Sequence, residues 1–414
     1  MLDIKIIVLS TLIFLFVILL LVSILIYIRN KILPKGKVKI IINDQKILET
    51  QPGNNLLHTF SENGIYLPSA CGGQGTCGLC RCQVFEGGGS ILPTEIGFFN
   101  RKEIENKWRL SCQVKVRNDI RVKIPETLFG IKKFDCEVIS NKNVATFIKE
   151  FIVKVPDDLN FDFKPGGYIQ IYVPAYDLSY RDIYIEPEYR DEWNRYNLWN
   201  LEVHNNSEIY RAYSMANHPA EGKIIMLNVR IATPPIDKKT GKFKNVPPGI
   251  CSSYIFSRRP GEKVTVSGPY GEFFIKNTDR EMIYIGGGAG MAPLRSHIFH
   301  LFYTLKTNRK VSYWYGARSK REIFYEEDFR KIEKEFSNFS FHIALSEPKP
   351  EDNWEGLTGF IHQVVYDEYL SKHKEPEEIE YYLCGPKVMI NAILKMLEDL
   401  GVPQEMIAFD DFGN

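Results

Sequence analysis

Residues 71–80 read Cys-Gly-Gly-Gln-Gly-Thr-Cys-Gly-Leu-Cys, and a further cysteine follows much later at Cys112. The spacing is C-x5-C-x2-C with a distant fourth cysteine. Four thiolates hold an iron–sulfur cluster, and plant-type [2Fe–2S] loops have the spacing C-x4-C-x2-C…C, so this loop is one residue longer. A loop that wraps a cluster needs backbone with positive φ, which glycine adopts at little cost, and glycine stands at 72, 73, 75 and 78. The pattern predicts a [2Fe–2S] cluster held by Cys71, Cys77, Cys80 and Cys112.

Two other interpretations of these cysteines stay open. A structural zinc site usually pairs two C-x2–4-C units, and this sequence has only one. The plainer alternative is a set of four buried cysteines without any ligand. We expect Cys82 and Cys136 to be small buried side chains rather than functional thiols.

The sequence around this loop, residues 36–129, predicts a small α+β domain. β-rich runs at 38–43 and 46–50 flank Asn43-Asp44, which indicates a hairpin, and a short helix is expected over 55–62. This stretch resembles the ferredoxin domain, and the resemblance implies the β-grasp fold.

The N-terminus, residues 1–35, predicts a membrane anchor and a linker. No residue from Ile6 to Ile28 is charged, and a helix of that length reaches about 34 Å, enough to cross a hydrocarbon core. A cleaved signal peptide is the alternative, but its apolar region is shorter and ends at small residues. Pro34 and Gly36 are expected to end the helix. The basic residues after the helix place the rest of the chain in the cytoplasm by the positive-inside rule; they are Arg29, Lys31, Lys35, Lys37 and Lys39.

Cytoplasmic placement and composition exclude some functions. In a reducing compartment, clustered cysteines indicate metal or redox chemistry before disulfides. The formal net charge of +1 argues against a nucleic-acid partner. The hydrophobic content of 44% allows large cores, and the length predicts several domains.

Residues 130–277 predict an antiparallel β-barrel. Alternating β-branched, aromatic and polar residues at 134–155 and 168–173 are separated by Pro165-Gly166-Gly167, as in short strands joined by turns. Arg211-Ala212-Tyr213-Ser214 follows, and Gly249 to Ser252 could open a helix whose free N–H groups bind an anion. Taken alone, R-x-Y-S is a weak signal that also fits an exposed arginine in a strand.

In this order, the motifs resemble the flavin domain of the ferredoxin–NADP reductase superfamily. The resemblance implies that Arg211 binds the FAD phosphates, Tyr213 lies against the isoalloxazine and Ser214 lies near flavin N5. It also implies that Gly249 and Ser252 hold the pyrophosphate.

Within the barrel region, residues 176–208 form an insertion rich in tyrosine, tryptophan and charge. A segment of this composition is not expected to be barrel core. A docking surface for a partner and a self-packed excursion over the surface are both consistent with it.

Residues 278–414 predict a doubly wound α/β domain that binds a nucleotide. An apolar strand at 282–285 leads into a glycine loop and a helix over 294–305, the context in which backbone approaches a pyrophosphate. Further parallel strands are expected at 311–316, 339–344 and 381–384. The loop resembles the G-G-G-x-G-x-x-P loop of ferredoxin reductases, with Gly286, Gly287, Gly288 and Gly290 as cofactor-binding residues.

Cys384 ends the last of these strands. Ligands bind at the carboxyl ends of such strands, and the superfamily resemblance places this cysteine beside the nicotinamide. A buried strand-end cysteine without a role is the alternative. The choice of nucleotide is open, because the basic run Arg318-Ser319-Lys320-Arg321 could read a 2′-phosphate, with Glu322 after it.

Over essentially the full length, the order of anchor, ferredoxin domain, flavin barrel and nucleotide domain resembles the F subunit of the sodium-translocating NADH:quinone oxidoreductase. The resemblance implies NADH oxidation, FAD, one [2Fe–2S] cluster and partner subunits of a complex that reduces ubiquinone. It implies a single-pass protein of the bacterial cytoplasmic membrane, in contact with lipid. A flavin takes the electron pair of a hydride and releases it singly, so the cofactors form an ordered pathway. The anchor has no ionisable group within the membrane, so sodium transport must belong to partners.

Two alternatives remain. One is an anchored NAD(P)H-dependent reductase of a membrane oxygenase, and the other is a scaffold with degenerate sites, although no motif is broken. Phe412, in the terminal Asp410-Asp411-Phe412-Gly413-Asn414, is expected to cover the flavin face where nicotinamide stacks, as a C-terminal aromatic does in the superfamily. Ordinary packing at the sheet edge is the other interpretation of Phe412.

Overall fold

The computed structural model describes residues 2–32, 36–235, 237, 239 and 243–410. The chain forms two compact units, Met1–Leu67 with Gly73–Gly130, and Pro68–Gly72 with Ile131–Asn414. We refer to them as unit 1 and unit 2.

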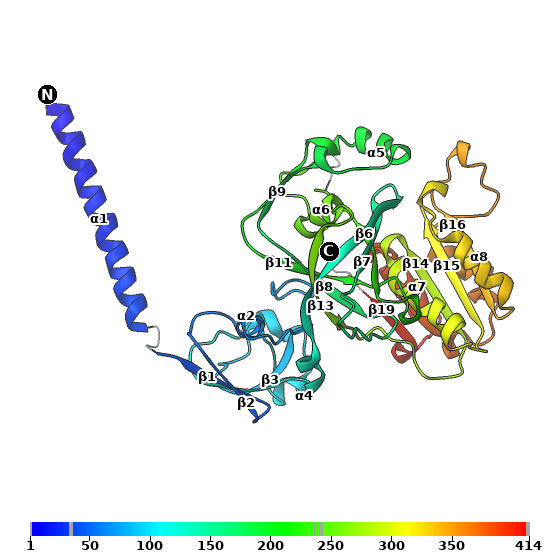
Figure 1. The fold of residues 1–414 in the computed structure, drawn as a ribbon, viewed down its shortest axis with the longest axis horizontal. Helices are drawn as coiled ribbons and strands as arrows, with labels where there is room; N and C mark the ends of the chain where they lie inside the picture. The colour runs from blue at the N-terminus through cyan, green and yellow to red at the C-terminus, as the bar shows by residue number, and fades with distance from the viewer. Residues whose placement is uncertain (1, 33–35, 236, 238, 240–242, 411–414) are drawn as a thin grey trace. The chain divides into compact units, whose positions relative to one another are not determined.

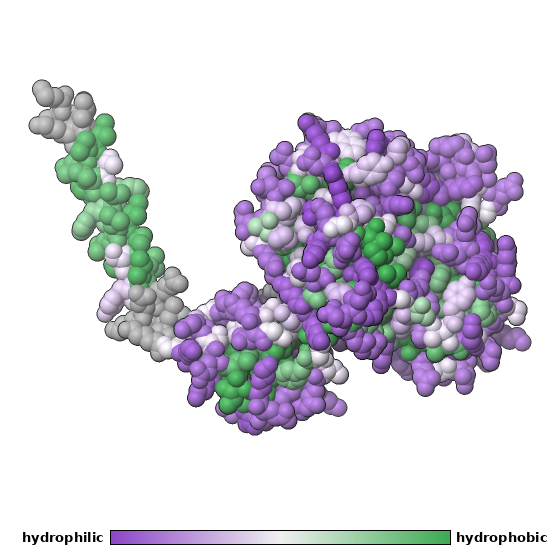
Figure 2. All heavy atoms as spheres, viewed as in Figure 1, coloured by the Kyte–Doolittle hydropathy of each residue, from purple (hydrophilic) through white to green (hydrophobic). Residues whose placement is uncertain are grey.

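The N-terminal helix α1, Leu2–Ile32, is a single long helix (Figure 1). Its stretch Ile6–Ile28 is long and apolar enough to cross a membrane, and every side chain along it is exposed (Figure 2). The hydroxyls of Ser10 and Thr11 donate to the carbonyl of Ile7, so they present little polarity to their surroundings. The expected apolar helix is confirmed; Pro34, expected near its end, lies outside the described residues.

A chain shortened to begin at Lys37 should be soluble without detergent and should keep its FAD and iron. The reason is that the exposed apolar surface of α1 is removed, while the cores of both units lie beyond it. Ultracentrifugation and cofactor analysis of the shortened chain check this. Loss of both cofactors on shortening would show that the anchor is part of a folded domain.

The rest of unit 1 is a mixed sheet with short helices. The strands are β1 (Val38–Ile42), β2 (Lys46–Thr50), β3 (Arg81–Glu86), β4 (Trp108–Leu110) and β5 (Ile120–Lys123), in the order β2-β1-β5-β3-β4. The helices are α2 (Leu56–Glu62), α3 (Pro93–Ile96) and α4 (Arg101–Glu105). The expected hairpin is confirmed, since Asn43 and Asp44 have φ of 52° and 56° between β1 and β2, the left-handed geometry of a tight hairpin turn. The Asn55 side chain accepts a hydrogen bond from the His58 N–H and starts α2.

Unit 2 begins with an antiparallel barrel. Its strands are β6 (Lys132–Ala145), β7 (Ile148–Lys154), β8 (Tyr168–Val173), β11 (Ile209–Ser214), β12 (Ile224–Arg230) and β13 (Lys263–Tyr270), in the order β11-β8-β13-β6-β7-β12. A bridge between Met215 and Leu227 joins the first and last strands of this order and closes the barrel. Helix α6, Ile250–Ser257, packs with six of its residues buried.

The aromatic insertion carries the hairpin β9 (Tyr176–Ser179) and β10 (Glu202–Asn205), and helix α5 (Arg190–Arg195). The expectation that it lies outside the barrel core is wrong for its largest buried side chains. Trp193 and Tyr180 are fully buried in the barrel core cluster. The Trp193 Nε1 donates to the Thr146 carbonyl at 3.0 Å, and the Tyr180 hydroxyl lies 2.8 Å from Ser253 Oγ. Their polar atoms find partners on the barrel, so these rings can be buried with it.

The remainder of unit 2 is a parallel sheet with helices on both faces (Figure 1). The strands are β14 (Met282–Gly287), β15 (Val311–Ala317), β16 (Phe339–Leu345), β17 (Leu357–Thr358), β18 (Glu380–Cys384) and β19 (Ile407–Asp410), in the order β17-β16-β15-β14-β18-β19. The helices are α7 (Met291–Phe299), α8 (Glu326–Glu335), α9 (Ile361–Glu368) and α10 (Lys387–Asp399). The expected parallel strands are confirmed, and β19 adds an edge strand that the sequence pattern did not indicate. Alternate residues of β14 enter two different cores, which confirms the doubly wound fold.

His297 of α7 is fully buried where the nucleotide sheet meets the barrel turn at Gly166. Its Nε2 donates to the Phe273 carbonyl at 3.0 Å, and its ring stacks on Phe273 at 4.9 Å. A Cβ at Gly166, whose φ is 85°, would lie 1.9 Å from the Phe273 carbonyl oxygen, so only glycine fits. Burial lowers the pKa of His297 from about 6.5 to about 4.

We expect unit 2 to lose stability as the pH falls below about 6.5. Between that value and the folded-state pKa of about 4, the unfolded chain binds a proton at His297 that the folded chain does not, so the free energy of unfolding falls with pH. The contribution of this one group is about 2 kcal/mol at pH 5. Thermal melts from pH 7.5 to 5 should therefore fall less steeply for His297→Gln than for the parent chain. An equal fall of the melting temperature in the two chains would show that His297 binds its proton as readily in the folded chain as in the unfolded chain, which would contradict the lowered pKa.

Candidate functional site

The loop that carries the first three predicted cluster ligands has the expected backbone. Its glycines 72, 73, 75 and 78 have φ of 66°, 85°, 78° and 70°. A Cβ at Gly75 would lie 2.5 Å from Gln113 Nε2, and one at Gly78 would lie 2.5 Å from Phe98 Cδ1. The loop is therefore wound tightly, as a loop that encloses a small inorganic group must be.

Two of the predicted ligands, Cys80 and Cys112, are buried in the core of unit 1. The Cys112 thiol beside it, together with burial, raises the pKa of the Cys80 thiol. Bound metal has the opposite effect, because a coordinating thiol is deprotonated outright. Two buried thiols this close together could serve as neighbouring ligands of a [2Fe–2S] cluster, which would hold both as thiolates.

The other two predicted ligands lie in different segments. Cys77 is partly exposed in unit 1, and Cys71 is buried in Pro68–Gly72, which belongs to unit 2. Ser69 Oγ lies 4.0 Å from Cys71 Sγ. In the described part of the chain, no three His, Cys, Asp or Glu side chains are gathered as one mononuclear ion requires.

Unit 1 also contains polar residues that the sequence analysis missed. Arg81 Nη2 donates to the Phe98 carbonyl at 2.5 Å, and its Nη1 donates to Glu103 at 2.8 Å. Arg109 Nη2 donates to Glu95 at 2.7 Å, in a pair whose side chains are 6% and 0% exposed. The same Glu95 accepts from the Leu110 N–H, so the pair fixes the strand that leads into Cys112. Their only sequence signal is position, since each arginine lies within three residues of a ligand cysteine.

The predicted flavin residues lie together on β11. Arg211 Nη1 donates to the Tyr210 carbonyl at 2.8 Å, and no described carboxylate lies within ion-pair distance of Arg211. A guanidinium without an acidic partner can bind a phosphate bidentately. Tyr213 packs against the barrel core, and burial raises the pKa of its hydroxyl, so the ring stays neutral.

Ser214 ends β11 with only 8% exposure, and its Oγ donates to Asp410 Oδ2 at 2.8 Å. Asp410 is the last residue of β19, so this bond joins the flavin strand to the edge of the nucleotide sheet. No local sequence pattern marks Asp410 as a partner of Ser214, because the two residues are far apart in the chain. Phe412 lies outside the described residues.

Gly249 is the N-cap of α6, which confirms the helix expected there. The Ser252 hydroxyl donates to the Gly249 carbonyl at 3.1 Å and accepts from the Ala232 N–H. Ser252 therefore shapes the start of the helix, and its own hydroxyl is already engaged. A Cβ at Gly249 would lie 2.6 Å from Ala232 Cβ, so glycine is required by packing. The N–H groups of the first helical turn are the anion-binding groups of this segment.

The glycine loop follows β14 at the carboxyl edge of the sheet. A Cβ at Gly290 would lie 2.1 Å from the Cys384 carbonyl oxygen, and one at Gly286 would lie 2.6 Å from a Leu294 methyl. A Cβ at Gly287 would lie 3.1 Å from the Gly316 carbonyl oxygen, and Gly288 has φ of 56°. The glycines bring the loop and the end of β18 into close contact, with Cys384 fully buried at the junction. Backbone packed this closely can approach a pyrophosphate.

Three family models match the chain in this order. They are the 2Fe-2S iron-sulfur cluster binding domain over residues 40–117, the oxidoreductase FAD-binding domain over 196–275 and the oxidoreductase NAD-binding domain over 284–395. Among solved structures, an Amycolatopsis cytochrome P450 reductase shares the fold at a TM-score of 0.63 and 21% identity, covering 91% of this chain and 98% of its own. The ferredoxin reductase of carbazole 1,9a-dioxygenase has a TM-score of 0.58 and 26% identity over the same shares.

The fold and the site thus define a flavin- and [2Fe–2S]-dependent oxidoreductase of the ferredoxin reductase type, which uses NADH. Relatives named as the F subunit of Na(+)-translocating NADH-quinone reductase are 53% identical in Idiomarina loihiensis, over 97% of both chains, and 51% identical in Neisseria gonorrhoeae, over 98% of this chain and 99% of the other. The chain belongs to this family, the F subunits of Na(+)-translocating NADH-quinone reductases.

Proposed function

We propose that this chain is the NADH-oxidising subunit of a membrane complex that reduces quinone and translocates sodium ions. When bound, FAD accepts a hydride from NADH and passes electrons singly to the [2Fe–2S] cluster. The bond between Ser214 and Asp410 carries the proposal, because it joins the strand proposed for flavin to the sheet proposed for NADH.

The barrel residues bind and orient the flavin nucleotide. Arg211, which has no described carboxylate partner, neutralises a phosphate, and the N-terminus of α6 at Gly249 offers N–H groups to the pyrophosphate. Ser252 holds the Gly249 turn in the shape that this requires. Tyr213 stays neutral and provides an aromatic wall.

Ser214 and Cys384 are the proposed catalytic residues beside the reacting rings. The Ser214 hydroxyl has its proton directed at Asp410, so its oxygen lone pairs could accept from the N–H that a flavin carries once it is reduced. Cys384 lies at the carboxyl end of β18, and its burial keeps water from this part of the nicotinamide site. Gly286, Gly287, Gly288 and Gly290 admit the NADH pyrophosphate by having no side chain. Phe412 is proposed as the cover of the flavin face.

Cys71, Cys77, Cys80 and Cys112 are the proposed ligands of the cluster. The buried ion pair between Glu95 and Arg109 holds the strand before Cys112. Both charged side chains are almost completely shielded from solvent. Helix α1 is the proposed single-pass anchor in the lipid of the bacterial inner membrane, with the catalytic domains in the cytoplasm; its basic C-terminal flank supports this orientation. Partner subunits carry the sodium pathway, since Ile6–Ile28 contains no charged side chain.

Quinone-linked NADH oxidation by native membranes, with and without sodium, tests the proposal. Sodium should accelerate quinone reduction by membranes that contain the parent chain, and membranes with Cys80→Ser in its place should lose this activity. The reductase of a membrane oxygenase is the other candidate for the acceptor. Sodium-independent oxidation that persists without quinone but requires an oxygenase substrate would favour that candidate and contradict the proposal.

A further inference from the structure

The basic run after β15 is held by acidic residues of the aromatic insertion. Arg321 Nη1 donates to both carboxylate oxygens of Asp191, at 2.8 and 2.9 Å, and to the Glu188 carbonyl at 3.0 Å. Arg318 Nη2 lies 3.6 Å from the Glu192 carboxylate and 3.8 Å from that of Glu322. Both arginines that could read a nucleotide phosphate are therefore already paired.

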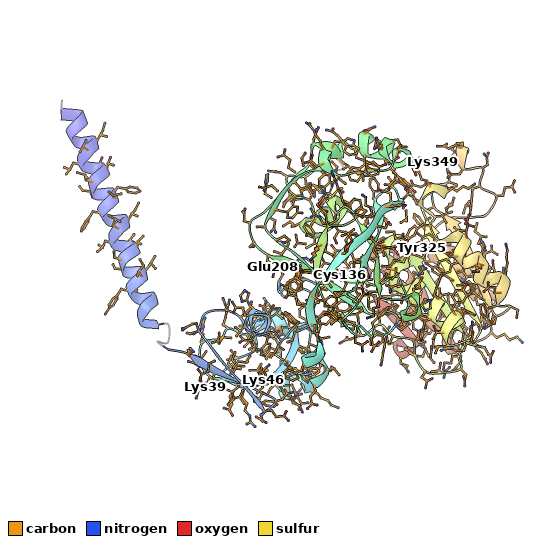
Figure 3. The ribbon with its side chains drawn as sticks, in the orientation of Figure 1. Lys39, Lys46, Cys136, Glu208, Tyr325 and Lys349 are labelled. Carbon is orange, nitrogen blue, oxygen red and sulfur yellow. The ribbon has the colours of Figure 1, made fainter. Side chains whose placement is uncertain are left out.

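The remaining member of the run is engaged as well. The Lys320 N–H donates to Asp352 Oδ2 at 3.1 Å, and its Nζ donates to the Asp352 carbonyl at 3.4 Å. Lys349 of the loop after β16 lies beside α5 in Figure 3 and contributes a further positive charge near Asp191. Arg318 and Arg321 thus lie against carboxylates, and Lys320 and Lys349 lie near the carboxylate of Asp352, so an added phosphate would meet negative charge at this edge.

Moving these carboxylates away from the arginines would disrupt buried packing and hydrogen bonds. Glu192 is 4% exposed, and the next residue, Trp193, is fully buried in the barrel core. Glu322 is held from the other side by the Thr146 N–H, at 3.1 Å from its carboxylate, and by the Thr146 hydroxyl. Because Thr146 also accepts from Trp193, one barrel turn fixes both the insertion and the end of the basic run.

The order of the strands indicates which part of a bound dinucleotide lies at the carboxyl ends of β15 and β16. This step rests on the proposed function. The glycine loop after β14 takes the pyrophosphate, and Cys384 at the end of β18 takes the nicotinamide side. The adenosine half must then extend the other way, over the carboxyl ends of β15 and β16, where Arg318 to Arg321 stand. Glu347, two residues after the end of β16, donates its N–H to the Arg318 carbonyl at 2.8 Å and adds another carboxylate there.

We propose that Asp191 and Glu192 of the insertion select NADH over NADPH by occupying Arg321 and Arg318. A 2′-phosphate adds up to two negative charges and needs arginine or lysine donors. Here it would meet carboxylates and would have to displace Asp191 from Arg321 Nη1 to reach the guanidinium. NADH, which carries a hydroxyl at that position, does not require this. Arg321 Nε and Nη2 are buried, and Nη2 lies 4.0 Å from the Glu192 carboxylate. The donor that a phosphate could reach is therefore Nη1, which Asp191 occupies until its carboxylate is neutralised.

The test uses the full chain in detergent with NADH or NADPH and ferricyanide as the acceptor. Asp191→Asn with Glu192→Gln should raise the ratio of kcat/KM for NADPH to that for NADH by about tenfold or more. It should also tighten binding of 2′-phospho-AMP relative to AMP, which needs no turnover. Asp191→Asn alone, at an exposed side chain, should give about a threefold rise and covers the case in which the double variant fails to fold.

Two further variants make the result specific. Glu188→Gln removes an exposed acid of the same insertion whose contact with Arg321 is through its backbone carbonyl, and it should leave both ratios unchanged. Adding Arg321→Gln to Asp191→Asn should abolish the gain, because the freed guanidinium is the phosphate ligand. An unchanged ratio in folded, FAD-loaded Asp191→Asn, or an equal rise in Glu188→Gln, would overturn the inference. Failure of the parent chain to oxidise NADH at all would instead contradict the proposed function.

Discussion

Cys80→Ser should remove most of the iron and the visible iron–sulfur absorption while leaving FAD bound. The expected loss is large because Cys80 is 1% exposed beside Cys112, so no other thiol can take its place without rearranging the core of unit 1. A serine hydroxyl is a far weaker ligand for iron than a thiolate, which is the ligand these clusters use. Iron and acid-labile sulfide analysis with absorption spectroscopy measures the effect. Reduction of the bound FAD by NADH should persist, because the flavin and nucleotide residues belong to unit 2.

Cys82→Ala is the matched control for this change. Cys82 lies two residues further along the same chain and is fully buried, and burial raises the pKa of its thiol, as expected for a packing residue. This variant should keep its cluster and lose only some stability. Iron lost equally in both variants would show that the effect is unfolding of unit 1. Iron retained in Cys80→Ser, or stoichiometric zinc in the parent chain, would contradict the assignment of the ligands.

Ser214→Ala should slow flavin reduction by NADH by about a hundredfold at nearly unchanged FAD content. Removal of one directed hydrogen-bonding group at a reacting centre has an effect of this size. Asp410→Asn should slow the reaction less, because an amide oxygen can still accept from Ser214 while the charge is lost. Stopped-flow absorbance of the flavin at saturating NADH gives the rate.

Ser257→Ala is a suitable control, since that hydroxyl donates to the Tyr254 carbonyl at the end of α6 and should not affect the rate. A thermal melt of each variant separates a kinetic effect from a loss of folding. Equal reduction rates in Ser214→Ala and the parent chain would contradict the placement of Ser214 beside the flavin. Loss of FAD from Asp410→Asn would show that the bond serves binding of the cofactor.

The sequence alone was sufficient wherever the signal is local. Asn43-Asp44 indicates a hairpin because both residues tolerate positive φ, and both adopt it. The cysteine loop and the Gly286 loop require glycine because a Cβ would clash with neighbouring atoms or because the backbone has a positive φ, and the structure shows these features. The four inner strands of the nucleotide sheet, β14, β15, β16 and β18, are short apolar runs with turns between them, so their positions were predicted within a residue or two.

Other features depended on segments that meet only in the folded chain. Asp410 reaches Ser214 because β19 adds to the edge of the sheet, and a four-residue edge strand has no distinctive pattern. The insertion was misjudged because tyrosine, tryptophan and charge mixed together indicate a surface, whereas Trp193 is buried once its Nε1 finds the Thr146 carbonyl. The basic run was ambiguous for a related reason: a sequence shows the charge of Arg318 and Arg321 but not the carboxylates that neutralise it. Charges act through space, so only the tertiary structure could pair these arginines with Asp191 and Glu192.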